Sequence, residues 1–143
     1  MRTQTADSRP TARHMRPHVA AFVTRLTDRG RVPLDYTVDS LKVVDHIIDG
    51  LRRGSPAPDR VRGTLFDLGA YAGEVLVRRT GAQWVDLSSQ HQRLFAQPVG
   101  IRMPDARVWN PVGKAVNRFE AGPPESLHTL YLLLHGRRPA TAP

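Results

Sequence analysis

Residues 59–87, DRVRGTLFDLGAYAGEVLVRRTGAQWVDL, decide the fold of this chain. At the helical period of about 100° per residue, the apolar side chains from Val61 to Leu76 share one arc. Gly69, Ala70 and Gly73 extend this arc with small residues, so more than half of the circumference is apolar or small. A helix with such a surface is buried on several sides. The stretch therefore predicts a central helix, and its glycines predict the close approach of another backbone.

A narrow polar stripe remains on this helix. It carries Tyr71, Glu74 and Arg78, together with Asp67 one turn earlier. Glu74 precedes Arg78 by four residues, which is the favourable order for an ion pair on a helix. An exposed pair of this kind contributes only about 0.3–0.5 kcal/mol. The plain interpretation is therefore a surface Glu–Arg pair.

The alternative interpretation gives Glu74 a chemical role. A carboxylate acts as a general acid or base when burial and neighbouring groups move its pKa toward the working pH. This requires the polar stripe to face a pocket walled by Trp84 and Trp109, with Tyr71 and Arg78 tuning the carboxylate. Glu74 is thus the candidate catalytic residue. Tyr71, Glu74, Arg78, Trp84 and Trp109 are the candidate ligand-binding residues, although each tryptophan is first of all expected as an anchor of the core.

The end of the central helix has two interpretations. Residues 74–79 and 83–87 could form a hairpin around Thr80 and Gly81. Alternatively the helix continues to Arg79 and Gly81 is its C-terminal stop. We favour the helix.

Two amphipathic helices precede this stretch. The first covers residues 17–29, and the second follows the capping residue Thr37 and stops at Gly54. Asp45 and His46, on the second helix, suggest an acid–base pair. Adjacent residues on a helix do not face each other, however, and both fall on its polar side, so we expect a solvated face.

Short strands follow the central helix. Residues 83–87 and 99–103 predict two strands that pair antiparallel, and residues 107–109 predict a third short one. Residues 88–97 are expected to form a connection or a poorly paired extension.

Two further helices complete the chain. Asn110 and Pro111 provide a capping residue and a proline in the first helical position, and a last helix covers about residues 124–135. Helices flank a short sheet without βαβ alternation. The predicted fold class is α+β, with about five helices packed around a small antiparallel sheet of two or three strands.

The 143 residues correspond to one domain, and the charge is concentrated at its ends. The formal net charge is +8, yet residues 34–136 carry twelve basic and eleven acidic side chains. We predict a disordered basic N-terminal arm at 1–16, a single domain at 17–136 and a flexible tail at 137–143. A nearly neutral body weakens the case for a nucleic-acid-binding face but leaves a basic arm open.

Several classes of site lack their sequence signals. The chain has no cysteine, no apolar run near the ~20 residues of a membrane span, and no GxGxxG, GxxxxGK[ST], HExxH or GxSxG motif in a supporting context. His14 and His18 are four residues apart, but two histidines are too few for a metal site. We therefore expect no cofactor, no metal and no membrane span, and a cytoplasmic location.

A resemblance joins three stretches of the chain: DYTVDSLKVVDHIIDGL at 35–51, GAYAGEV at 69–75 and GAQWVDL at 81–87. Together they resemble a family of small actinobacterial proteins that share the outline SL..VD, GAY.GEV and G..WV. The likeness covers about residues 34–87 and, more loosely, 98–135. It implies a compact α+β domain, and it implies no catalytic residue because the family has no assigned activity.

These observations favour a small non-catalytic binding or accessory protein. Its partner would be another protein or a small molecule, in a specialised-metabolite, resistance or immunity setting, and a homodimer is left open. One alternative is a small enzyme that uses Glu74 as general acid or base. Another is nucleic-acid binding through the basic termini, which would be strongly salt-dependent.

Overall fold

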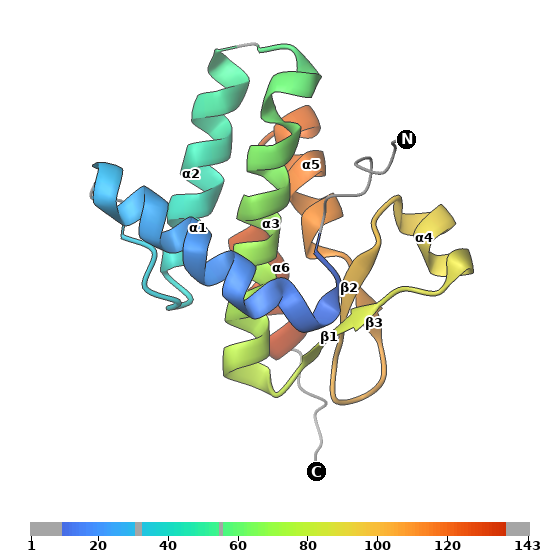
Figure 1. Cartoon of the computed structure of the whole chain (residues 1–143). Helices are drawn as coiled ribbons and strands as arrows, with labels where there is room; N and C mark the ends of the chain where they lie inside the picture. The colour runs from blue at the N-terminus through green and yellow to red at the C-terminus, as the bar shows by residue number, and fades with distance from the viewer. Residues whose placement is uncertain (1–9, 31–32, 55, 137–143) are drawn as a thin grey trace.

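Helix α3, Pro58–Thr80, is the central element of the computed structural model, which describes residues 10–30, 33–54 and 56–136. Helices α1 (Met15–Gly30), α2 (Ser40–Arg53), α5 (Pro111–Ala121) and α6 (Leu127–Gly136) surround α3, as Figure 1 shows. Near the C-terminal end of α3 lies an antiparallel sheet of three strands in the order β1-β2-β3. The predicted α+β class is confirmed.

The buried face of α3 is wider than its sequence pattern indicates. Every residue from Leu68 to Leu76 is buried, and Tyr71 and Glu74 are both 0% exposed. The interpretation of Glu74 and Arg78 as a surface pair is therefore wrong at Glu74. Other elements cover the middle of the polar stripe, at Tyr71 and Glu74, whereas the Arg78 side chain stays partly exposed.

Two glycines of α3 mark where its neighbours come closest. A Cβ at Gly69 would lie 2.5 Å from the Cα of Val112 and 2.9 Å from the carbonyl oxygen of Pro111, both backbone atoms of α5. A Cβ at Gly73 would lie 2.5 Å from the ring of Trp84 and 2.7 Å from Ile101. The expected close approach of a backbone is confirmed at Gly69, whereas side chains of the sheet fill the space at Gly73.

The C-terminal end of α3 settles the choice between helix and hairpin. The helix continues to Thr80, and Gly81 follows in the left-handed conformation with φ of 81°. Strand β1, Gln83–Asp86, then pairs antiparallel with β2, Val99–Arg102. Strand β3, Val108–Trp109, pairs with the other edge of β2. The helix and all three predicted strands are confirmed.

The segment between β1 and β2 departs from its prediction. Residues 88–97 were expected to be a connection or a poorly paired extension, but they contain helix α4, Ser89–Phe95. The Ser88 side chain accepts a hydrogen bond from the backbone N–H of His91 at 3.2 Å, which caps this short helix. The helix ends at Ala96, whose φ is 59°.

The N-terminal boundary also differs from the prediction. Residues 12–14 form a 3₁₀ turn that leads into α1, and Met15 is 0% exposed. The backbone N–H of Ala12 donates to Asp86 Oδ1 at 2.8 Å. Residues 10–16 are thus part of the fold, and the domain does not begin at residue 17. The remainder of the predicted arm, 1–9, and the predicted tail, 137–143, lie outside the described residues.

Asp45 is a structural residue and not part of a solvated face. Asp45 is 7% exposed, and its side chain reaches from α2 to the N-terminus of α6. There it accepts hydrogen bonds from the Ser126 hydroxyl at 2.6 Å and from the backbone N–H groups of Leu127 and His128 at 2.8 and 3.3 Å. Free N–H groups at a helix start favour a negative charge, so Asp45 caps α6 from another helix.

Replacing Asp45 by alanine is expected to destabilise the protein by about 2–3 kcal/mol, because buried donors at the start of α6 lose their acceptor. Urea denaturation measures this change in the free energy of unfolding. Asp39→Ala is the matched control, since Asp39 directly precedes α2, the helix that carries Asp45. The Asp39 side chain is 87% exposed, and its only described ion-pair partner is Lys42 at 3.9 Å. Equal effects of the two variants would contradict the capping role.

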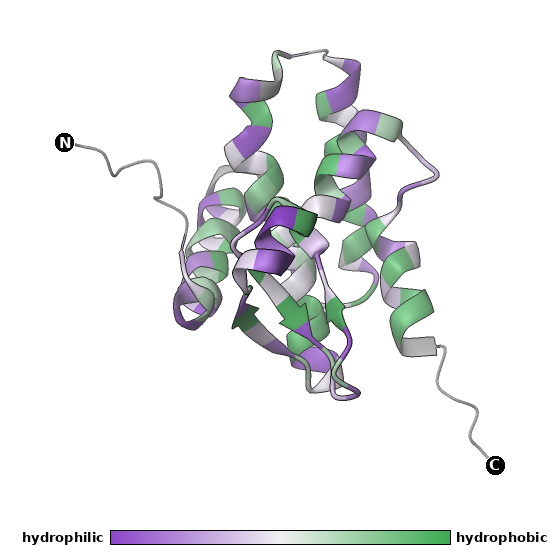
Figure 2. Cartoon of the chain, turned by 90° about the vertical axis from the view of Figure 1, so that its right-hand side faces the viewer, coloured by the Kyte–Doolittle hydropathy of each residue, from purple (hydrophilic) through white to green (hydrophobic). Residues whose placement is uncertain are grey.

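The outer helices each present one face to the interior. In Figure 2, hydrophobic and hydrophilic bands alternate along them. The helix before the C-terminal trace, α6, is hydrophobic over most of its length, and its Leu132 and Leu133 are 49% and 55% exposed.

No helix in the described part of the chain is long and apolar enough to cross a membrane.

Candidate functional site

Glu74 lies at the meeting point of α1, α3 and β1. Its Oε2 atom accepts hydrogen bonds from Nε of Arg16 at 2.9 Å and from Nε of Arg78 at 3.0 Å. Its Oε1 atom accepts a hydrogen bond from Nε1 of Trp84 at 3.0 Å. The ion pair predicted with Arg78 is confirmed, but it is one of three contacts to a carboxylate that is 0% exposed.

This geometry favours a structural role for Glu74. A general acid or base must reach the proton that it transfers, at hydrogen-bonding distance or through one water molecule. Both oxygens of Glu74 already accept charged or polar donors, and the side chain is closed to solvent. The arrangement joins three elements of the fold around one buried charge.

Tyr71 faces a different set of partners. Its hydroxyl group lies 2.6 Å from the Ser40 hydroxyl and accepts a hydrogen bond from the backbone N–H of Tyr36 at 2.7 Å. Burial raises the pKa of the Tyr71 hydroxyl above its usual value. Tyr71 therefore fixes the segment before α2, and among the described residues its hydroxyl bonds to Tyr36 and Ser40 and not to the Glu74 carboxylate.

Tyr36 connects this segment to Arg78. The guanidinium carbon of Arg78 lies 3.6 Å from the centre of the Tyr36 ring, a close cation–π contact. The backbone of Tyr36 has φ of 65°, and its carbonyl oxygen accepts a hydrogen bond from Arg79 Nε at 3.0 Å. A tyrosine in the left-handed region is uncommon, so these contacts hold it in an unfavourable conformation.

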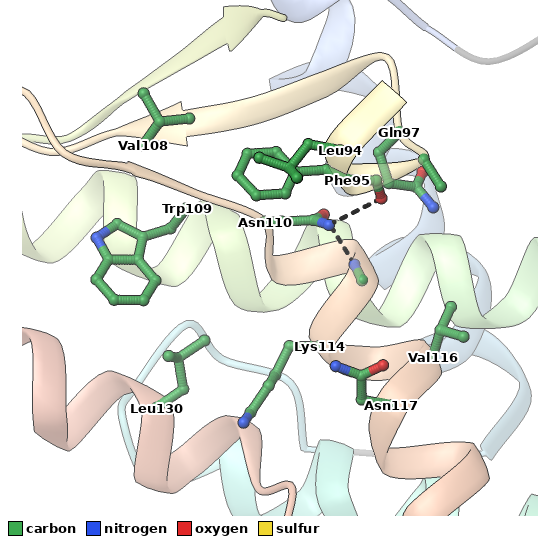
Figure 3. Close-up of a pocket in the computed structure, with 12 residues that line it drawn as sticks. Leu94, Phe95, Gln97, Val108, Trp109, Asn110, Lys114, Val116, Asn117 and Leu130 are labelled. Carbon is green, nitrogen blue, oxygen red and sulfur yellow. Dashed lines mark hydrogen bonds between the residues drawn. The ribbon is translucent and has the colours of Figure 1, made fainter. Parts of the chain in front are cut away.

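The fifth candidate residue, Trp109, lies elsewhere. It lines a groove of about 570 Å³ between α4, β3, α5 and α6 (Figure 3). The two tryptophans therefore do not wall one pocket around Glu74, as the enzyme interpretation required. Trp84 packs over Gly73 and donates to Glu74, while Trp109 belongs to the groove.

The groove combines apolar walls with a few polar groups. Its lining includes Leu94 and Phe95 of α4, Trp109 of β3, Lys114 of α5 and Leu130 of α6. Leu94 is 72% exposed, which is high for a large apolar side chain. The Lys114 amine pairs with Glu125 at 2.7 Å and marks a charged position in the groove wall.

Asn110 fixes one end of the groove. Its Oδ1 atom accepts a hydrogen bond from the backbone N–H of Gly113 at 2.9 Å, and its Nδ2 atom donates to the carbonyl oxygen of Phe95 at 3.1 Å. The capping role predicted for Asn110 is confirmed, and the same side chain ties α4 to α5. The helix that lines one wall of the groove is thereby anchored to the other wall.

One buried donor near the groove has no partner. Within the part of the chain that the structure describes, nothing accepts a hydrogen bond from Nε1 of Trp109. Figure 3 places this nitrogen on the edge of the ring turned away from Asn110 and Lys114. The Trp109 ring therefore contributes an aromatic surface to this side of the groove.

The described residues contain no cluster of three or more side chains suited to hold a metal ion. Each of the two histidines of the N-terminal segment has a hydrogen-bonding partner other than the second histidine. His14 lies 3.0 Å from the Thr11 hydroxyl, and His18 lies 2.7 Å from Asp67. The His18 contact is one of the links between α1 and α3.

The candidate site residues predicted from the sequence do not include Arg16, and Trp109 is the only one of them that lines the groove. Arg16 fell in the segment assigned to a disordered arm, although Met15 precedes Val19 by four residues and extends the apolar face of α1 by one turn. That spacing is the signal that could have found it. The groove has no comparable signal, because its walls come from four elements.

Comparison of the chain with models of protein families, with curated proteins and with solved structures finds no match. The resemblance to small actinobacterial proteins stays a prediction. Any assignment of function therefore depends on the geometry of the two regions described above.

Proposed function

We propose that this protein is a non-catalytic binding protein and that the groove beside Trp109 holds a small-molecule ligand. The observation that carries the proposal is the groove itself, with a volume of about 570 Å³ and a mainly apolar lining. Small-molecule sites in proteins have volumes of roughly 300–1,000 Å³ and combine apolar walls with a few polar groups. The specialised-metabolite, resistance or immunity setting predicted from the sequence belongs to this proposal as well.

The lining suggests the chemistry of the ligand. Phe95, Trp109 and Leu130 offer an aromatic and aliphatic surface, which suits a flat apolar body. Lys114 and Asn117 offer hydrogen-bond donors on one wall. The ligand expected here is a mostly apolar molecule with a hydrogen-bond acceptor, such as a carbonyl or carboxylate oxygen, at one side.

The enzyme alternative has less support. Glu74 is 0% exposed and accepts hydrogen bonds from three side chains. It is not among the residues that line the groove. The nucleic-acid alternative relied on the termini, and residues 1–9 and 137–143 lie outside the described residues. Neither alternative is favoured by a specific observation.

A substitution that fills the groove with a larger side chain tests the proposal. Asn117→Phe adds an aromatic side chain to the groove from an exposed position on α5. We expect it to weaken binding of any ligand found in a small-molecule screen by at least tenfold, measured by calorimetry, because the added ring occupies the site.

Thr64→Phe is the matched control, since Thr64 is exposed on α3 and does not line the groove. It should leave the affinity unchanged. A ligand that binds the Asn117→Phe protein as tightly as the wild type, or a screen of apolar carboxylic acids and carbonyl compounds that yields no binder, would contradict the proposal.

A further inference from the structure

Arg16 and Arg78 bring two positive charges together over one buried carboxylate. Both donate Nε to the same Oε2 atom of Glu74, at 2.9 and 3.0 Å. The two guanidinium groups therefore lie side by side, and Glu74 neutralises only one of them. The three side chains together carry a net charge of one positive unit, at a site distinct from the groove.

The outer donors of both arginines are free within the described part of the chain. A guanidinium group has further N–H donors on its two terminal nitrogens. No described residue accepts a hydrogen bond from the terminal nitrogens of Arg16 or Arg78. The Arg16 side chain is 62% exposed and that of Arg78 is 38% exposed, so these donors are accessible from solvent.

Tyr36 holds Arg78 in place and adds a hydroxyl group. The Arg78 guanidinium stacks on the Tyr36 ring at 3.6 Å, which restricts the plane of the guanidinium. Burial raises the pKa of the Tyr36 hydroxyl, Arg78 and Arg16 act to lower it, and Glu74 acts to raise it. The hydroxyl group is carried by the ring that the Arg78 guanidinium covers, so it lies beside that guanidinium, and its raised pKa keeps it a neutral donor.

The next cation along α3, Arg79, contacts the segment before α2. Arg79 donates Nε to the carbonyl oxygen of Tyr36 at 3.0 Å. The Asp35 carboxylate accepts hydrogen bonds from Thr37, and these bonds are the main cause that lowers the pKa of Asp35. The positive charge of Arg79 lowers this pKa further. Within the cluster of Arg16, Arg78 and Glu74, one positive charge has no partner carboxylate among the described residues.

We propose that Arg16, Arg78 and the Tyr36 hydroxyl form a binding site for a phosphate group. Arginine matches phosphate oxygens with parallel N–H donors, and two adjacent guanidinium groups suit a dianion better than a monoanion. The Glu74 carboxylate lies beneath the pair with both oxygens occupied and no exposed surface, so an incoming anion meets donors and not the carboxylate.

NMR of the arginine side chains tests this site. The Nε–H signals are followed while inorganic phosphate or adenosine monophosphate is added at constant ionic strength. We expect saturable shifts for Arg16 and Arg78 in the millimolar range or tighter, and no shift for Arg25. The tighter of the two ligands identifies a free or an esterified phosphate as the source. No saturation with either, or acetate binding as tightly, would overturn the proposal.

Matched variants separate the site from general attraction. Arg16→Gln is expected to weaken phosphate binding at least tenfold. Arg25→Gln removes the same charge from the same helix, at an arginine that is 58% exposed and lies 3.6 Å from Asp67 of α3, and should change the affinity less than twofold. Tyr36→Phe keeps the ring under Arg78 and should weaken binding severalfold. Equal losses in the two arginine variants, at equal melting temperatures, would overturn the assignment.

Discussion

Replacing Glu74 by alanine is expected to destabilise the fold by about 3–4 kcal/mol, as removal of one partner from a buried charge network does. The variant leaves the Trp84 indole N–H without an acceptor and leaves Arg16 and Arg78 side by side without a counter-charge. It also opens a cavity in a part of α3 where every residue is buried. Urea denaturation followed by tryptophan fluorescence measures the loss.

Glu74→Gln separates charge from shape. Glutamine retains an acceptor oxygen for Trp84 but carries no charge for the arginines, so we expect a smaller loss of about 2 kcal/mol. Glu120→Ala is the control, because Glu120 is exposed on α5, and a surface substitution changes stability by less than about 0.5 kcal/mol. A Glu74→Ala protein as stable as the control would show that the network is not structural.

Replacing Gly69 by alanine is expected to destabilise the protein by about 3 kcal/mol, at the upper end of the usual cost of overpacking. The new methyl group would lie 2.5 Å from the Cα of Val112 and 2.9 Å from the carbonyl oxygen of Pro111. Both are backbone atoms, which cannot rotate away as a side chain can. Helices α3 and α5 would have to separate, and the groove wall formed by α5 would move with them.

Gly63→Ala is the matched control on the same helix. A Cβ at Gly63 has no neighbour within 4 Å, and alanine favours a helix over glycine by about 1 kcal/mol. We therefore expect Gly63→Ala to stabilise the protein while the same substitution at Gly69 destabilises it. Effects of the same sign at both positions would contradict the close crossing of α3 and α5.

Local signals in the sequence predicted much of the fold. The wide apolar and small arc of α3, its stop at Gly81 and the capping pair Asn110–Pro111 depend on neighbours within a few residues, and all three are present. The alternation of residues 99–103 likewise places β2 correctly. Such features follow from periodicity and capping, which a single sequence contains.

The interactions between distant segments could not be predicted in this way. Glu74 is buried because Arg16, 58 residues earlier, and Trp84 close over it. Asp45 is buried because it caps a helix that begins 82 residues later. Both residues occupy polar positions on an isolated helix, so helix periodicity alone places them in solvent. Only the packing of the helices reveals their partners.

The candidate site divides for the same reason. Glu74, Arg78 and Trp84 were named from the sequence and do meet, with Tyr71 close by through Tyr36. Trp109 was named with them but lines the groove instead. Sequence spacing located residues on one helix and its adjoining strand, and it gave no information on which cavity a tryptophan from another strand would face.

The indole N–H signals of the two tryptophans give the most direct test of the central claim, that the groove binds a ligand and Glu74 is structural. In a ¹⁵N spectrum recorded during titration with an uncharged carbonyl ligand from the screen, which does not compete for the Arg16–Arg78 pair, the Trp109 signal should shift and saturate. The Trp84 signal should stay in place, because its hydrogen bond to Glu74 is closed to solvent. A shift of the Trp84 signal with an unchanged Trp109 signal would contradict the account and return the binding site to Glu74.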